Sequence, residues 1–210
     1  MINKYSKIKN IIFPNKKINF MIIIILFLGI ISGAIFSNII DLNDQKLVLE
    51  KISSFISNIN NNTIDNIQAF KNSIITNISY SFIIWILGMT IIGVIINIFI
   101  LYLKGFIFGF SLSAFILTYS YKGILLSILY TLFGQLLNII TISMLTIYSI
   151  MFTFNFLKQI IKSKHNLNIL KSFKNYSIIF IITILINIIS SISETFLFPT
   201  LIKIIIKLFI

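Results

Sequence analysis

The stretch INFMIIIILFLGIISGAIFSNII, residues 18–40, contains no charged side chain. A helix needs about 20 mostly apolar residues to cross the hydrocarbon core of a bilayer, so this stretch is long enough to span it. Five lysines and no acidic residue precede it: Lys4, Lys7, Lys9, Lys16 and Lys17. Because basic residues collect on the cytoplasmic side, the sequence predicts a cytoplasmic N-terminus, residues 1–17, and a first transmembrane helix, residues 18–40.

A cleaved signal peptide would also begin with basic residues and an apolar run. Its apolar region covers about 7–15 residues and ends at an A-x-A-like site. The run in this chain is longer, and only Ser32-Gly33-Ala34 resembles a cleavage site. We therefore expect the first helix to remain uncleaved.

The composition extends this interpretation to the whole chain. Of its 210 residues 58% are hydrophobic and 10% are charged, whereas soluble domains average about 25% charged residues. The net charge of +12 would suggest nucleic-acid binding in a soluble protein, but the lysines cluster at the ends of apolar runs, where they signal topology. We expect an all-α integral membrane protein that contacts the lipid bilayer and no nucleic acid.

Residues 41–77 form a polar segment that we expect outside the cytoplasm. The segment holds four of the five acidic residues. Apolar residues recur in it at helical spacing, and they predict an amphipathic helix that begins with Asp44 as its N-cap and ends at Asn60-Asn61-Asn62. The apolar positions are Val48, Ile52, Phe55, Ile56 and Ile59. This helix is expected either to lie on the membrane and the bundle or to dock a partner.

Residues 78–195 are expected to hold transmembrane helices two to five. The predicted helices cover residues 78–103, 105–120, 123–157 and 176–193, with a basic cytoplasmic loop over 158–175. Each of the joints at Tyr102-Leu103-Lys104-Gly105 and Tyr119-Ser120-Tyr121-Lys122-Gly123 combines aromatic residues with a lysine and a glycine, which is typical of a turn at the membrane interface. The long fourth run is expected to tilt, to break near Gly134 or to extend into the cytoplasm.

The last residues, 196–210, follow Glu194 and contain Pro199. Lys203 and Lys207 share one face of this segment, which is typical of an interfacial helix with snorkelling lysines. A short sixth transmembrane helix is the alternative. The predicted fold is therefore a bundle of five, or possibly six, transmembrane helices.

Small residues recur every fourth position on two of the predicted helices. Small residues let helix backbones approach closely in lipid, where packing rather than the hydrophobic effect drives association. We expect these faces to pack inside the bundle, and a homo-oligomer or a partner helix is the alternative. The residues are Gly29 and Gly33 on helix one, and Gly105, Gly109 and Ser113 on helix three, with Gly88 and Gly93 on helix two.

Polar side chains inside membrane helices are costly unless they are paired, and they are candidates for function. Gln135, Asn138 and Asn187 are expected at intramembrane depth, either as hydrogen-bonding contacts between helices or along a polar path. Lys104, Lys122, Glu194 and Pro199 are expected at the membrane interface. No ionisable group is then expected at mid-membrane depth, which weakens the case for proton-coupled transport.

The sequence predicts no enzyme. Paired carboxylates, a histidine-based nucleophile system, a Walker loop and the H-E-x-x-H pattern are missing from it, and the chain has no cysteine and one histidine, His165. We therefore expect no catalytic residue, no metal site and no cofactor.

Five short stretches occur in an order that resembles the stage II sporulation protein M family. They are FLGIISGAIFSN at 27–38, WILGMTIIG at 85–93, LKGFIFGF at 103–110, YKG at 121–123 and ETFLFP at 194–199. Members of that family often have a proline beside the glutamine of the fourth helix, where this chain has Gly134 before Gln135. The resemblance covers roughly residues 20–205.

The resemblance implies a non-enzymatic protein of the mother-cell membrane at the sporulation septum. Family members are understood to anchor wall-degrading enzymes during engulfment, with an amidase like stage II sporulation protein P and a lytic transglycosylase like stage II sporulation protein D as partners. The alternative from the residues is a small permease or the membrane subunit of a transporter. Convergence of the polar residues on a water-accessible cavity would favour transport, and scattered contacts between helices would favour the scaffold.

Overall fold

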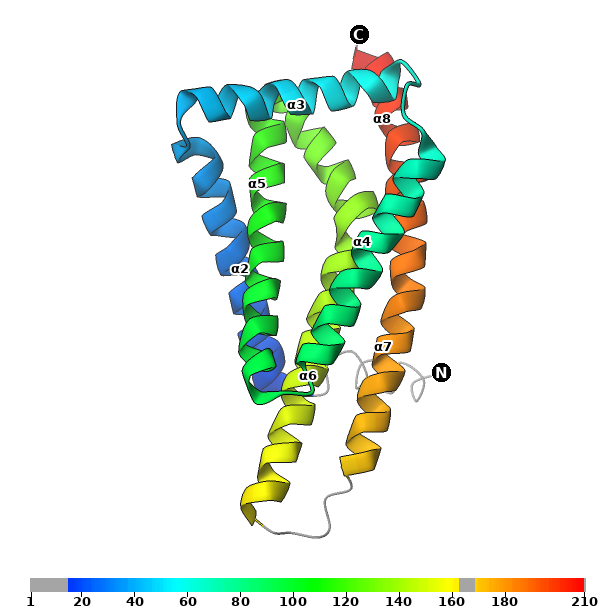
Figure 1. Ribbon diagram of the computed structural model, residues 1–210. Coiled ribbons are helices and arrows are strands. Elements are labelled where there is room, and N and C mark those ends of the chain that lie inside the picture. Colours follow the sequence, from blue (N-terminus) through cyan, green and yellow to red (C-terminus); the bar gives the residue numbers. More distant parts are fainter. Residues whose placement is uncertain (1–14, 163–168, 210) are drawn as a thin grey trace, which may run out of the picture.

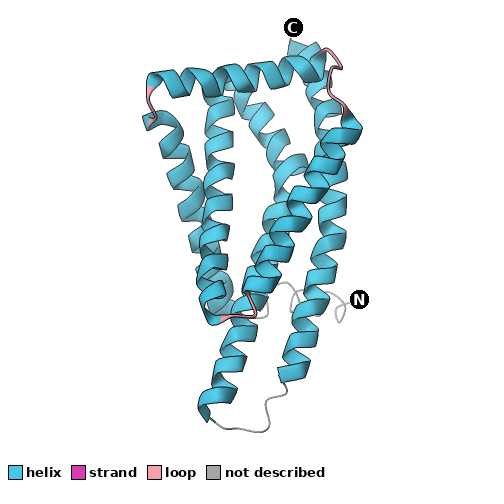
Figure 2. Ribbon diagram, viewed as in Figure 1, coloured by secondary structure: helices cyan, strands magenta, loops and turns pink. Residues whose placement is uncertain are grey.

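The computed structural model describes residues 15–162 and 169–209, and these residues are helical apart from short turns (Figures 1 and 2). The expected all-α membrane fold is confirmed. The helices, in chain order, are α2 (Lys16–Ile39), α3 (Leu42–Asn60), α4 (Asn66–Leu87), α5 (Ile91–Leu129), η1 (Tyr130–Gln135), α6 (Leu136–Lys162), α7 (Ile169–Ile192), η2 (Ser193–Leu197) and α8 (Phe198–Phe209).

The chain passes along the bundle five times, with α3 lying across one end (Figure 1). The passes are α2, α4, α5, then η1 with α6, and finally α7 with η2 and α8. Among the described residues four segments are long and apolar enough to cross a membrane, 16–39, 91–129, 136–159 and 169–204. The first turns of α4 are polar, which keeps α4 below that hydropathy even though it packs between α6 and α7.

Side-chain caps fix where three helices begin. The side-chain oxygens of Asn15, Asp65 and Thr90 accept backbone N–H groups in the first turns of α2, α4 and α5. Such caps satisfy donors that have no partner within the helix. For α3 the N-cap position is Asp41, so the expectation of Asp44 is wrong: Asp44 lies within the first turn.

The expected hairpin at Lys104-Gly105 is wrong. The chain turns earlier, between Leu87 and Ile91, and α5 continues through Lys104 without a break. Gly88 ends α4 and Thr90 caps α5, so this turn needs no lysine. Lys104 therefore lies roughly 20 Å along α5 from its start, inside the bundle rather than at its edge.

The expected turn near residues 119–123 is present as a kink within α5. Ser120 has a φ of 50°, which interrupts the helical backbone, and residues 121–129 then lead into η1. Gly123 lies so close to the carbonyl of Phe115 that an added Cβ would overlap it. Lys122 is half-buried next to this kink. The break expected near Gly134 takes the form of the π-helical turn η1.

The segment after Pro199 neither lies flat on the membrane nor folds back as a sixth span. In Figure 1 α8 continues the direction of α7 towards the end of the bundle that α3 covers. Phe198 and Ile202 are buried against Ile56 and Ile59 of α3, and Lys203 bonds the side chain of Asn62. The apolar face of α3 is therefore covered by α8 in addition to the end of α5.

The small-residue faces of α2 and α5 lie against each other. An added Cβ on Gly105 would come within 2.6 Å of the Leu26 carbonyl oxygen, and one on Gly109 would overlap the Ile30 carbonyl. Gly29 and Gly33 lie equally close to the α5 backbone. The two helices run in the same direction, because Asn38 at the far end of α2 bonds Ser113 at 3.2 Å. These faces are used within the chain, so they are not left for a second copy.

Candidate functional site

A polar cavity of about 340 Å³ lies between α4, α5, η1, η2 and α8, below α3. Phe55 of α3 and Ile64 of the following turn lie at its outer end, with Phe198 and Pro199. Nine further lining residues are polar or charged: Asn72, Ser73, Thr76, Asn77, Lys104, Gln135, Asn138, and Glu194 and Thr195 of η2. Its size falls within the range of about 300–1,000 Å³ found for small-molecule sites.

Glu194 points into the bundle and lines the cavity. Ser73 of α4 donates a hydrogen bond of 2.7 Å to its Oε2, and Gln135 of η1 donates one of 3.3 Å to its Oε1. A carboxylate has about four acceptor positions, so these two bonds leave room for further donors. Lys104 and Glu194 both fall within segments that are long and apolar enough to cross a membrane, 91–129 and 169–204.

Lys104 faces the same cavity from α5. Its Nζ lies 4.0 Å from the centre of the Tyr80 ring, a cation–π contact with α4. The Lys104 and Glu194 charges attract each other across the cavity but do not form an ion pair. Within residues 15–162 and 169–209 the Lys104 ammonium has no hydrogen-bond acceptor, although it carries three donors.

Two π-helical turns position the cavity walls. η1 carries Gln135 as its last residue and η2 carries Glu194 as its second, and the two turns pack against each other. A π-turn inserts an extra residue into the helical ladder and is frequent at functional sites, because it turns side chains away from their regular helical positions. Here both turns direct their polar residue to the same space.

A chain of hydrogen bonds leads from the cavity into the bundle. Asn77 donates to Ser191 at 3.1 Å, and Asn138 donates to the side chain of Asn77. Asn187 donates to Ser81 at 2.7 Å and to the Asn77 carbonyl at 3.1 Å. These hydrogen bonds join α4, α6 and α7, so Asn138 and Asn187 act as contacts between helices. Asn138 also lines the cavity.

Beyond this series of hydrogen bonds the bundle is filled by a mostly apolar layer. Ile84, Leu101, Ile142 and Leu145 are fully buried there. Below them the Tyr176 hydroxyl donates to the Ile84 carbonyl at 3.0 Å. An added Cβ on Gly88 would overlap that hydroxyl, and one on Gly93 would overlap the Leu87 carbonyl. Glycine is thus required at Gly93, where the overlap is with backbone, whereas at Gly88 the side chains of Tyr176 and Ser149 would have to move. The buried apolar residues lie between the cavity and this end of the bundle.

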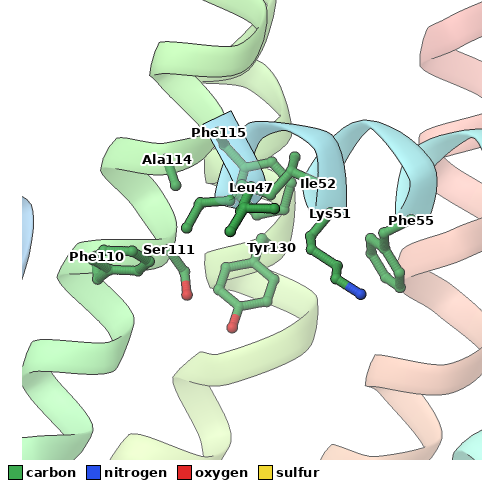
Figure 3. Close-up of a pocket in the computed structure, with 10 residues that line it drawn as sticks. Leu47, Lys51, Ile52, Phe55, Phe110, Ser111, Ala114, Phe115 and Tyr130 are labelled. Carbon is green, nitrogen blue, oxygen red and sulfur yellow. The ribbon is translucent and has the colours of Figure 1, made fainter. Parts of the chain in front are cut away.

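A second cavity of about 370 Å³ lies beside the first, between α3 and α5 (Figure 3). Its walls are mostly apolar, and Figure 3 shows Lys51 reaching down from α3 with Phe55 on one side and Tyr130 on the other. Tyr130 and Phe55 belong to both cavities and separate them.

The family model for stage II sporulation protein M matches residues 22–199, which is most of the chain. The chain belongs to the stage II sporulation protein M family. Comparison with curated proteins and with solved structures gave no match. As a member of this family with several apolar spans, the protein is a multi-pass sporulation membrane protein.

In this family member the structure brings Gln135, Asn138, Glu194, Pro199 and Lys104 to one cavity, while Lys122 and Asn187 lie elsewhere. Sequence reasoning missed Ser73, Asn77 and Tyr80, which were placed outside or at the start of a span. The sequence signal that could have placed them is Thr90, which is the N-cap of α5. With Thr90 as an N-cap, the preceding helix ends before it, and Asn66–Leu87 forms one uninterrupted helix. No group of three metal-binding side chains occurs in the part of the chain that the structure describes.

Proposed function

We propose that this protein is a non-enzymatic membrane scaffold that holds wall-degrading enzymes at the outer face of the mother-cell membrane during engulfment. The partners would be an amidase like stage II sporulation protein P and a lytic transglycosylase like stage II sporulation protein D. The observation that carries the proposal is α3, a helix that lies across one end of the bundle (Figure 1) and whose charged residues are exposed.

The anchoring of α3 supports a docking role. Ile56 and Ile59 are buried against α8 and α5, while Asp44, Glu50 and Ser54 are exposed on the opposite side. A rigid helix presents its side chains at fixed positions, which reduces the entropy that a partner loses on binding. With the N-terminus in the cytoplasm, as the five N-terminal lysines favour, α3 faces the compartment that contains the cell wall.

Affinity purification from sporulating cells tests the scaffold. We expect the tagged protein to recover wall hydrolases, and the double variant Asp44→Lys, Glu50→Lys to recover at least tenfold less of them. Lys174→Glu, on the opposite end of the bundle, is the matched charge-changing control and should recover them normally. Equal recovery with the double variant, at equal membrane level, contradicts docking on α3.

The polar cavity favours a second candidate, a small permease or the membrane subunit of a transporter. Gln135 and Asn138 meet there with Lys104 and Glu194, and polar groups gathered inside a helical bundle are candidates for a substrate site. The chain lacks cysteine, so single cysteines report accessibility without background. Thr76→Cys should react with an impermeant thiol reagent that is added from the outside. If the protein is a transporter, a second state must exist in which the Thr76→Cys variant reacts only with reagent on the cytoplasmic side.

A further inference from the structure

We propose that the cavity between Lys104 and Glu194 binds a small zwitterion, a molecule that carries a primary ammonium group and an anionic oxygen group. The anionic group would pair with Lys104 on α5 and the ammonium group with Glu194 on η2. This inference concerns a ligand of the membrane bundle and does not depend on the scaffold function.

The first observation is that the Lys104 ammonium has no hydrogen-bond acceptor among the described residues. It lines the cavity and lies 4.0 Å from the centre of the Tyr80 ring, which supplies no lone pair for its N–H donors. A charged group out of bulk water is costly unless it is paired and hydrogen-bonded. A carboxylate or phosphate group in the cavity would supply the missing acceptors.

The carboxylate of Glu194 supplies the second point of attachment. Ser73 and Gln135 hold it in place, and its remaining acceptor positions can receive N–H donors. A ligand with only a negative charge would be repelled by Glu194, and one with only a positive charge by Lys104. A neutral molecule with separated charges matches both walls.

The outer end of the cavity adds an apolar contact. Phe55, Ile64 and Phe198 line that end, next to Pro199 and Tyr130. The charged groups lie towards the bundle and the apolar residues towards α3. The ligand is therefore expected to carry an apolar part that points outward beneath α3.

Two sources provide this chemistry: a free amino acid or short peptide, and the headgroup of a lipid such as phosphatidylethanolamine. Phosphatidylcholine is a matched comparison, since its quaternary ammonium has no N–H to donate to Glu194. Both sources carry an N–H donor and an anionic group in the same molecule. The experiment below tests the two sources separately.

In the first arm, the purified full-length protein in detergent is heated with L-phenylalanine, N-acetyl-L-phenylalanine or L-phenylalaninamide. A free zwitterion at about 100 times its Kd should raise the midpoint of thermal unfolding by roughly 5 °C, and the two singly charged analogues should not. In the second arm, native mass spectrometry of protein from mixed-lipid nanodiscs should show roughly tenfold more retained phosphatidylethanolamine than phosphatidylcholine.

Lys104→Met and Glu194→Gln should abolish whichever signal is found, while Lys46→Met on the exposed face of α3 should preserve it. Both cavity variants are first checked for insertion and for a single species in size-exclusion chromatography. If Lys104→Met fails this check, the conservative Lys104→Arg is used and should retain the signal. The proposal is overturned if neither arm gives a signal in the unaltered protein, or if the cavity variants bind as it does.

Discussion

Gln135 at the end of η1 donates a hydrogen bond of 3.3 Å to Glu194 in η2. The two residues are far apart in sequence, and each lies in a π-helical turn, so the bond joins the two irregular segments of the bundle. We expect Gln135→Glu to lower the stability by about 1 kcal/mol or more, because two carboxylates would then share one site. Thermal unfolding in detergent measures this.

Gln68→Glu is the matched control for that substitution. Gln68 is exposed in the first turn of α4, where a negative charge is favourable. Its unfolding midpoint should stay unchanged or rise slightly, and a drop equal to that of Gln135→Glu would refute the role of the Gln135–Glu194 contact.

The contact between α2 and α5 predicts a sharp glycine requirement. Gly109→Ala should cost about 1–3 kcal/mol, because the added methyl group overlaps the Ile30 backbone. Gly134→Ala should be tolerated, since its nearest neighbour would be the Tyr130 ring at 3.4 Å. Unfolding midpoints of the two variants compare the sites directly, and similar losses at both would argue against close packing of α2 on α5.

The position of the inner turn can be checked with single cysteines. Met89→Cys should react with a membrane-impermeant maleimide only after the cells are permeabilised, because it lies in the turn between α4 and α5. Asn61→Cys, after α3, should react in intact cells. Leu103→Cys should react in neither case, since it lies in the middle of α5. Reaction of Leu103→Cys from the cytoplasmic side would contradict this structure and support a hairpin at Lys104 instead.

The anchoring of α3 predicts a local loss of protection. Ile59 is 1% exposed against α8, so Ile59→Ala should remove about 2–5 kcal/mol of packing and speed proteolysis at residues 60–63. Leu42→Ala, at a site that is 74% exposed, should leave the cleavage rate unchanged. Equal cleavage rates for the two variants would mean that α3 is not held by α8.

The sequence predicted the elements whose signals are local. Residues 18–40 contain an uninterrupted apolar run, and Val48 to Ile59 show helical periodicity up to the asparagines at 60–62, so α2 and α3 could be expected without tertiary information. The kink near Lys122 and the irregularity at Gly134 also had local signals.

The site depended on contacts that no local pattern encodes. Lys104 is followed by Gly105 and lies two residues after Tyr102, a pattern that is typical of a membrane interface. The turn that the structure has, at residues 88–90, contains no charged residue. Glu194 could be placed only once the register of α4 against α7 was known, because Ser73 and Gln135 come from distant segments. If the inner turn had been placed at 88–90, Lys104 would have been predicted inside the bundle, and an acidic residue such as Glu194 would have been sought near it.

The parallel contact of α2 with α5 has a consequence for biogenesis. The ribosome completes α2, α3 and α4 before the Gly105–Gly109 face of α5 has been made, so the glycine face of α2 stays without its final neighbour while the chain is still growing. The first pass therefore docks only when the third pass enters the bilayer, and α6 and α7 complete the core after that.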